Sequence, residues 1–515
     1  MNALKYITIC GLLPVTIASC NLNTQPLDTY SEITQGSDSL GSGNVILADR
    51  NAVLNQRQAL YQRLKDMQEY GYLDLLLLSE SHSDNAYAGS PSAETTPFEV
   101  NSIEGSNPNL QRDWTGYMTD IAQANILICG IDSLNDPSLS VPEANQYRSE
   151  GLIFRALAYF NMVRIWGNVP VITVVGKPIT AQNIAEVYPT YFPPQNTELE
   201  VYQQIEKDLL EAVRYAPDNN PSDKTLLTKS VARALLAKIY AEKPLRDYNK
   251  VITYVNQLEA DGLKLELDFA NLFGVVLADP ASPPSATNKA VDTKMRNSVE
   301  SILEVQYPVA SGNWVTWMFG RPLDDWNFYF TWAKWITPSR DLIKAFQSAG
   351  DTKRFNETNV YYSCGWNIYY PADNYAFMYK TRSSFNTIYK IRYADLLLLK
   401  AEALIQTGDL AGGAAIINQT RIRAGLGALP ASATSNSANA INALLNERRL
   451  ELALEGQRWF DLVRLDKVEE VMNVVYAKDS GRPAQVYPFD ENSYKLPIPQ
   501  NEIDLNPNLV QNPGY

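Results

Sequence analysis

The chain of 515 residues has one histidine, four cysteines and no long apolar run beyond its N-terminus. The single His82 excludes a multi-histidine metal site, and any Ser-His-Asp or Cys-His catalytic arrangement would have to use that one side chain. His82 lies in the polar stretch SESHSDNAYAG, where we expect an exposed surface histidine. No later segment has the roughly 18 uncharged apolar residues of a membrane-spanning helix.

The sequence also lacks the signals of nucleotide and nucleic-acid binding. GSGN at 41–44 has no accompanying Lys and no strand–turn–helix context, so it does not indicate a phosphate-binding loop. The formal net charge of −13 at pH 7 disfavours nucleic acid and anionic membrane surfaces, and favours neutral or cationic ligands. We therefore expect no cofactor, no metal and no nucleic-acid partner.

Helical periodicity dominates what is present. Apolar content of 45% and charged content of 20% are typical of a globular protein. The spacing of apolar residues predicts helices near 48–69, 112–134, 144–166, 196–215, 227–242, 246–259, 338–348, 391–407, 409–424 and 437–466. A short strand is predicted where Leu303, Val305 and Tyr307 alternate with polar residues. The expected fold class is mostly α with minor β.

The first 19 residues have the features of an export signal. Lys5 provides the positive start, and an apolar run covers 6–17. The run ends in Ile17-Ala18-Ser19-Cys20, and small residues before a cysteine resemble a lipoprotein signal. We expect lipid on Cys20 and a polar tether over 20–44. The alternative is an ordinary secretory signal with an incidental cysteine.

Two stretches, 230–258 and 393–425, have the length of helix-turn-helix repeats. Their small residues recur at a spacing that lets helices approach closely, which resembles the tetratricopeptide pattern; plain antiparallel hairpins are the alternative. Residues 260–390 between them have few predicted helices but many aromatics, which argues against disorder. We expect one domain over 45–515, with repeat-like helices at about 48–259 and 391–466 and a loop-rich insert between them.

The stretch NERRLELALEGQRWFDLVR, at 446–464, alternates charged and large apolar residues. Three opposite-charge pairs have helical i,i+3 spacing: Arg448–Glu451, Glu455–Arg458 and Asp461–Arg464. Gly456 is expected to break the run into two helices. The charges are therefore predicted to lock a helix junction, which is a structural role.

Aromatic residues supply the functional signal. The window WVTWMFGRPLDDWNFYFTWAKW, 314–335, contains five of the nine tryptophans, and a second cluster covers 361–380. A sugar ring offers an apolar face to an aromatic ring and hydroxyls to short polar side chains. The candidates from the window are Trp314, Trp317, Trp326, Tyr329, Trp332 and Trp335. Each ring could instead belong to the core, and the adjacent pair Asp324-Asp325 is poor evidence for a glycosidase.

Five segments resemble the SusD/RagB family of outer-membrane nutrient-binding lipoproteins. They are GLIFRALAYFNMVRIWGNVPVI (151–172), VYQQIEKDLLEAVRYAP (201–217), IRYADLLLLKAEALIQTGD (391–409), the charged block at 446–464 and the tail KLPIPQNEIDLNPNLVQNPGY (495–515). The resemblance implies a SusD-like fold with tetratricopeptide-like helix pairs. It also implies ligand contacts in a loop after the first long helix, which here corresponds to Asp84, Asn85 and Tyr87.

The function that the resemblance implies is capture without catalysis. A lipid-anchored protein on the outer face of the outer membrane would bind an oligosaccharide or polysaccharide and deliver it to a SusC-like TonB-dependent transporter. Two alternatives stay open at this point: a RagB-type protein that binds peptides, and a structural lid for the transporter without a ligand of its own.

Overall fold

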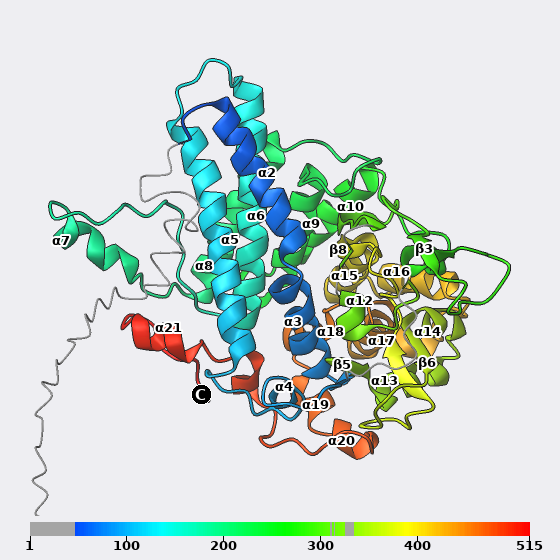
Figure 1. The fold of residues 1–515 in the computed structure, drawn as a ribbon. Coiled ribbons are helices and arrows are strands. Elements are labelled where there is room, and N and C mark those ends of the chain that lie inside the picture. The colour runs from blue at the N-terminus through cyan, green and yellow to red at the C-terminus, as the bar shows by residue number, and fades with distance from the viewer. Residues whose placement is uncertain (1–46, 310–311, 314, 325–333) are drawn as a thin grey trace, which may run out of the picture.

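Long helices form one side of the molecule in the computed structural model, which describes residues 47–309, 312–313, 315–324 and 334–515. Figure 1 shows α2 (Arg50–Asp66), α5 (Pro108–Ser133) and α6 (Val141–Trp166) running side by side. The layer continues through α8 (Glu198–Tyr215), α9 (Lys229–Ala241), α10 (Tyr248–Ala260), α15 (Tyr393–Gln406), α16 (Leu410–Arg423) and α17 (Ser437–Glu451).

Helix α6 is the central element of this layer. Every residue from Ser149 to Trp166 is buried, which fits a sequence that is apolar on all sides of the helix. Its N-terminus is closed by a capping box between Ser140 and Glu143. The buried guanidinium of Arg155 binds both carboxylate oxygens of Asp208 on α8, at 2.8 and 2.7 Å. The charge inside the layer is therefore paired.

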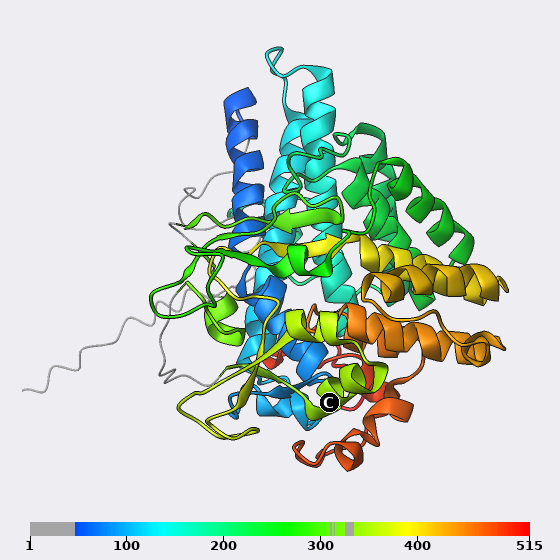
Figure 2. The same cartoon turned by 90° about the vertical axis from the view of Figure 1, so that its right-hand side faces the viewer.

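The helices predicted from periodicity are confirmed, with ends that differ by a few residues. The two predicted helix-turn-helix units are the hairpins α9–α10 and α15–α16, and α10 packs against α15 to join them. Figure 2 shows the second hairpin in yellow and gold, with orange α17 below it, on the side of the molecule opposite the loops of the insert. The mostly helical fold class is confirmed.

A wide-turned helical stretch after α2 was not predicted. It consists of a π-helix at Glu69–Leu73, α3 (Asp74–Leu76) and a second π-helix at Leu77–Ser81. The extra residue in each π turn shifts the register of the side chains. The polar residues at the end of this stretch and directly after it, 80–85, are all buried.

The insert contributes all the strands of the described residues except β1, and β8 extends just past its end. The described residues contain four antiparallel pairs: β1 (Ala86–Ala88) with β5 (Ile336–Pro338), β2 (Val275–Leu277) with β3 (Ala290–Thr293), β4 (Ser301–Val305) with β8 (Ile388–Arg392), and β6 (Asn359–Tyr362) with β7 (Tyr375–Met378). Strand β4 confirms the predicted strand. The helices of the insert are α11 (Phe269–Phe273), α12 (Val315–Phe319), α13 (Arg340–Ala349) and α14 (Thr352–Thr358).

Short helices complete the chain. They are α4 (Thr96–Glu99), α7 (Ile184–Val187), α18 (Arg458–Arg464), α19 (Val468–Met472), α20 (Val475–Lys478) and α21 (Gln500–Leu505). Among the described residues, none of the helices combines the length and the apolar character needed to cross a membrane. Cys129 and Cys364 are both free thiols.

The charged block forms the predicted helix junction. Helix α17 ends at Glu451 and α18 begins at Arg458, with Gly456 between them at a φ of +77°. Glu451 lies at the centre of a buried network: its carboxylate accepts hydrogen bonds from Arg354 at 3.0 Å and Arg392 at 2.7 Å, and from Arg423. The prediction of a charge-locked junction is confirmed.

The partners within the junction differ from the prediction. Of the three predicted pairs, Asp461–Arg464 forms, at 2.6 Å. Arg448 pairs with Asp395 and Asp461 rather than with Glu451. The other predicted pair, Glu455–Arg458, is likewise replaced by contacts with other segments. These side chains face the interior, where more distant parts of the chain supply the opposite charges.

Candidate functional site

The loop after the first long helix lies in the interior, so its three predicted ligand residues are not accessible. Asp84, Asn85 and Tyr87 are 3%, 1% and 0% exposed. Asp84 is bound by Arg458, Asn85 donates to Glu80 at 2.8 Å, and the hydroxyl of Tyr87 donates to Asp479 at 2.6 Å. This corrects the expectation of a surface loop, because the polar groups bind other parts of the protein.

Electrostatics reinforce the structural role of Asp84. Burial alone would raise the pKa of its carboxyl group, but the guanidiniums of Arg449 and Arg458 outweigh burial and hold that pKa well below its ordinary value. The carboxylate is therefore ionised and paired at neutral pH.

His82 also departs from the prediction. It was expected on the surface, but it is fully buried, with Nδ1 2.6 Å from the carbonyl oxygen of Phe98 and its ring 4.1 Å from that of Trp459. Burial lowers the pKa of this imidazole to about 4. The histidine is thus a neutral core residue, and nothing in its surroundings suggests catalysis.

The tryptophan-rich window is described in part. Trp317, on α12, is 44% exposed. Trp335 is half-buried, packs against the main core and lies 5.7 Å below the guanidinium of Arg112, so it is better placed for packing than for a ligand. The other predicted rings lie outside the described residues and stay predictions: Trp314, Trp326, Tyr329 and Trp332.

The segment that carries Trp317 runs along the β6–β7 hairpin. Gly320 forms a bridge with Met378 of β7, and the amide of Leu323 donates to the carbonyl of Arg382 at 2.8 Å. A Cβ on residue 320 would lie 2.0 Å from the carbonyl oxygen of Thr381, so the close approach requires glycine. The window and the second aromatic cluster of the sequence are thereby neighbours.

The hairpin presents its own aromatic rings. Tyr361 and Tyr362 at the end of β6, and Trp366 in the connection to β7, are each half-buried. The ring of Trp366 packs edge-on against Tyr375 at 5.5 Å, and the guanidinium of Arg321 lies 4.9 Å from the ring of Tyr362. We use "aromatic surface" as a collective name for Trp317, Tyr361, Tyr362 and Trp366, although the consecutive strand residues Tyr361 and Tyr362 point to opposite faces of β6.

The loop between β6 and β7 is fixed from beneath by two tyrosines. The hydroxyl of Tyr369 lies 3.0 Å from the carbonyl of Ala88 and 2.8 Å from the carboxylate of Glu99. The hydroxyl of Tyr370 donates to the carbonyl of Pro338 at 2.8 Å. These bonds orient the loop before a ligand arrives, which reduces the entropy cost of binding.

The same loop also carries short polar side chains. The exposed ones are Ser363, Asn367, Asp373 and Asn374. Burial raises the pKa values of the Tyr361 and Tyr362 phenols above their ordinary value, so both are neutral donors at neutral pH. Half-exposed rings beside hydroxyl, amide and carboxylate groups can bind a ligand that has both apolar faces and hydroxyls.

Sequence reasoning found the cluster at 361–380 but did not choose candidates from it. The signal was the density of aromatics beside Ser, Asn and Asp, the same signal that selected the 314–335 window. The strand alternation of β6 and β7, which decides which rings are buried, was not visible because the hairpin connection is long.

Acid–base chemistry has little support here. The carboxylate of Asp324 accepts hydrogen bonds from the amide and hydroxyl of Ser384, at 3.0 and 2.5 Å, which is a structural arrangement. Asp325 lies outside the described residues. Over the part of the chain that is described, no group of three His, Cys, Asp or Glu residues is placed to hold a metal ion.

Two family models match the chain and together span most of it. The model "SusD family" matches residues 315–515, and "Starch-binding associating with outer membrane", a SusD-like model, matches residues 27–241. The chain belongs to the SusD-like family. The family predicted from sequence resemblance is thereby confirmed.

Individual relatives agree with this membership. SusD-like protein P2 of Formosa agariphila is 27% identical over 446 residues, which cover 81% of this chain and 83% of the relative. A SusD superfamily protein from Bacteroides vulgatus has the same fold, with a TM-score of 0.71 and 19% identity over 91% of this chain and all of that one. A structure described as a laminarin-binding SusD-like protein has a TM-score of 0.67 and 23% identity, with 91% and 100% covered.

Proposed function

We propose that this protein captures an oligosaccharide or polysaccharide at the cell surface and passes it to a SusC-like TonB-dependent transporter in the outer membrane. Lipid on Cys20 would hold it to that membrane. The mechanism is binding without a chemical step. Because tethering raises the effective concentration of ligand near the transporter, weak individual contacts suffice.

One observation carries the proposal: the aromatic surface combines half-exposed rings with a fixed loop that bears short polar groups. Trp317 is the most accessible of these rings at 44% exposed. Peptide binding would call for a cleft with free backbone partners, and the β6–β7 hairpin instead offers ring faces. A SusD-like protein with the same fold is described as laminarin-binding, so laminarin is a rational first ligand to test.

The test uses the mature chain without its lipid and native gels cast with a panel of polysaccharides that includes laminarin. Retardation by one polysaccharide is expected. Trp317→Ala, Tyr362→Ala and Trp366→Ala should each weaken the retention by about 1 kcal/mol, the scale of an aromatic stacking contact. Tyr215→Ala is the matched control, because Tyr215 is 49% exposed and lies on α8.

Two results would contradict the proposal in different ways. Retardation that none of the three variants weakens would show that the ligand binds elsewhere. No retardation by any polysaccharide, together with binding in an oligopeptide titration, would favour the RagB-type alternative. If neither kind of ligand binds, the structural lid becomes the better description.

A further inference from the structure

A cavity of about 810 Å³ opens beside the C-terminal segment. Three parts of the chain line it: the loop 101–106 before α5, the segment 487–493, and the tail from α21 to Tyr515. In Figure 1, α21 at one end of this C-terminal cavity lies at the lower left of the molecule and β6 lies at the right. The other end is nearer to the β6–β7 loop, because Tyr369 of that loop contacts Glu99, two residues before Asn101 in the lining.

The walls of the C-terminal cavity are fixed by hydrogen bonds, most of them partly buried. The side-chain amide of Asn101 donates to the carbonyls of Tyr487 and Pro488, at 3.2 and 3.1 Å, and to the hydroxyl of Ser493 at 3.2 Å. The amide of Gln511 exchanges two hydrogen bonds with the backbone of Ile498, at 2.7 and 2.8 Å. The space is therefore preformed and needs no rearrangement to admit a ligand.

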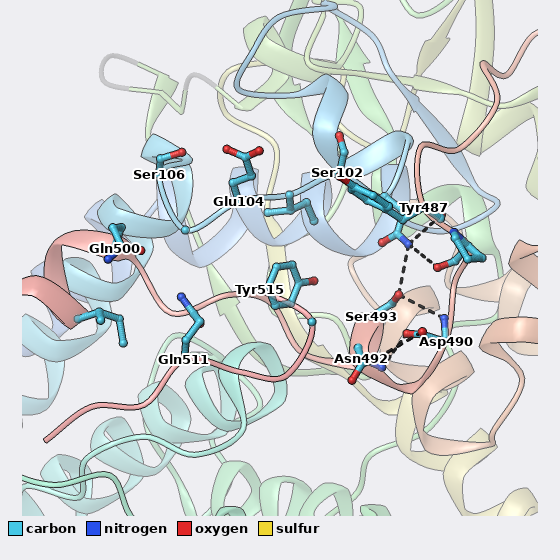
Figure 3. Close-up of a pocket in the computed structure, with 16 residues that line it drawn as sticks. Ser102, Glu104, Ser106, Tyr487, Asp490, Asn492, Ser493, Gln500, Gln511 and Tyr515 are labelled. Carbon is cyan, nitrogen blue, oxygen red and sulfur yellow. Dashed lines mark hydrogen bonds between the residues drawn. The ribbon is translucent and has the colours of Figure 1, made fainter.

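The lining has the two components that a sugar needs. Tyr487 and Tyr515 are 62% and 40% exposed, and Ile103 and Ile503 add apolar surface. Figure 3 shows Ser102, Glu104 and Ser106 in a row along one side, Gln500 at one end, and the ring of Tyr515 in the middle. Hydroxyl, amide and carboxylate groups thus surround exposed aromatic faces.

The charges of the residues that line the cavity limit the kinds of ligand that it can bind. No Lys or Arg is among the residues that line the cavity, so a phosphate or other anion has no counter-ion there. The carboxylate of Asp490 already accepts from the amide and side chain of Asn492, at 2.9 and 3.3 Å. Glu104 is the remaining carboxylate, which suits a hydroxyl donor. A neutral polyhydroxylated ligand fits this lining best.

We propose that the C-terminal cavity is a second binding site for a neutral oligosaccharide, separate from the aromatic surface. The inference rests on the proposed function, since it assumes that the ligand of this protein is a glycan. Two separated sites would hold one long polysaccharide at two points. The apparent affinity for the polymer would then exceed that of either site for a short fragment.

The test is a calorimetric titration of the full mature chain with laminarihexaose, or with the hexasaccharide of whichever other polysaccharide is retarded. The wild type is expected to bind two molecules. Tyr487→Ala removes a ring from the cavity, and Ser106→Trp fills the cavity. Each of these variants should bind one molecule. Trp317→Ala, with its site weakened about fivefold, should also leave one detectable site, and Trp317→Ala with Tyr487→Ala none. Tyr476→Ala is the matched control, because Tyr476 is 40% exposed on α20 and does not line the cavity.

The outcomes separate the two proposals. One site in the wild type, removed by Trp317→Ala and unchanged by Tyr487→Ala and Ser106→Trp, would overturn the second site and leave the proposed function intact. If the cavity variants lose a bound molecule and Trp317→Ala binds as many molecules as the wild type, the cavity is supported as a binding site. The proposal that the aromatic surface binds the glycan is then overturned. No binding of any saccharide would overturn both. Retention of polysaccharide should fall about fivefold, the equivalent of about 1 kcal/mol, in Trp317→Ala and in Tyr487→Ala.

Discussion

The carboxylate of Asp84 receives two hydrogen bonds from the guanidinium of Arg458, at 2.7 and 2.9 Å, across 374 positions of the sequence. The pair is buried and joins α18 to the loop that precedes β1. It belongs to the same interior network of charges as the α17–α18 junction. The residue that the family resemblance marks for a ligand contact is therefore a tie between two distant parts of the fold.

Asp84→Asn should destabilise the protein without abolishing glycan binding. Removing one partner of a buried ion pair costs about 3–5 kcal/mol, because the arginine is left unpaired in the interior. For a chain of this size the thermal midpoint should fall by several degrees. The measurement is thermal unfolding by circular dichroism, alongside native-gel retention below the transition. If the variant has wild-type stability but is no longer retained by the polysaccharide, Asp84 contributes to ligand binding and the structural assignment is wrong.

The protein should lose stability on mild acidification through His82. Its pKa of about 4 in the folded state is below the unfolded value of about 6.5, so between these values the unfolded chain binds the extra proton. The contribution of the neutral ring is therefore complete above pH 6.5 and is lost as the pH falls. Between pH 7 and pH 5 the loss is about 2 kcal/mol by linkage.

His82→Gln isolates this effect, because His82 is the chain's single histidine. The variant keeps a donor for the carbonyl of Phe98 but cannot titrate. Denaturant unfolding of both proteins at pH 5 and pH 7 should show a smaller loss in the variant. An equal loss in the two proteins would mean that His82 is solvated and that carboxylates alone set the acid sensitivity.

Local features of this fold were predictable, and long-range partners were not. The helices follow from apolar spacing, and the break at Gly456 follows from one residue type at one position. Arg458 was assigned to Glu455 because helical spacing was the available information, whereas its real partner is Asp84. Burial of His82 depends in the same way on the π turns upstream, which no short-range pattern announces.

The candidate site was likewise predictable in its local features and not in its long-range contacts. Composition located both aromatic segments, and the exposure of Trp317 agrees with its choice. The proximity of the two segments depends on the contact of Gly320 with β7, which is a tertiary feature. The family resemblance marked Asp84 and Asn85 by their position in the sequence, which does not reveal that their interior partners are Arg458 and Glu80.

Gly320→Ala should weaken glycan binding although the residue offers no side chain to a ligand. The added methyl would meet the carbonyl of Thr381 at 2.0 Å, so α12 must move away from β7. Overpacking of this kind costs about 1–3 kcal/mol and would displace Trp317. Native-gel retention and the thermal midpoint should both fall.

Gly456→Ala is the control for this substitution. A Cβ there would have ordinary contacts at 3.6 Å from Leu75 and Ser79, so the cost is that of a left-handed φ of +77°, about 1–2 kcal/mol. Its thermal midpoint should fall, but its retention should match the wild type. Equal retention by both variants would argue that the register of α12 on β7 does not matter for binding.

Tyr369→Phe should loosen the β6–β7 loop in a pH-dependent way. The change keeps the ring stacked on Tyr87 at 4.4 Å but removes the hydroxyl that lies near Ala88 and the buried carboxylate of Glu99. Glu99 keeps the hydrogen bond from the amide of Ala88, and loss of the second donor to this buried carboxylate costs about 1–3 kcal/mol. Burial already raises the pKa of Glu99, and losing the donor would raise it further.

Because the lost donor favours the charged carboxylate, the deficit of this variant should grow as rising pH ionises Glu99 and should shrink as acid protonates the carboxyl group in both proteins. Unfolding of Tyr369→Phe and the wild type at pH 7.5 and pH 5 gives the comparison, with the exposed substitution Tyr476→Phe as control. A deficit that is the same at both pH values would mean that the bond to the Ala88 carbonyl, and not the one to Glu99, holds the loop. If Tyr369→Phe also lowers polysaccharide retention, the ordered conformation of this loop is needed for the proposed binding.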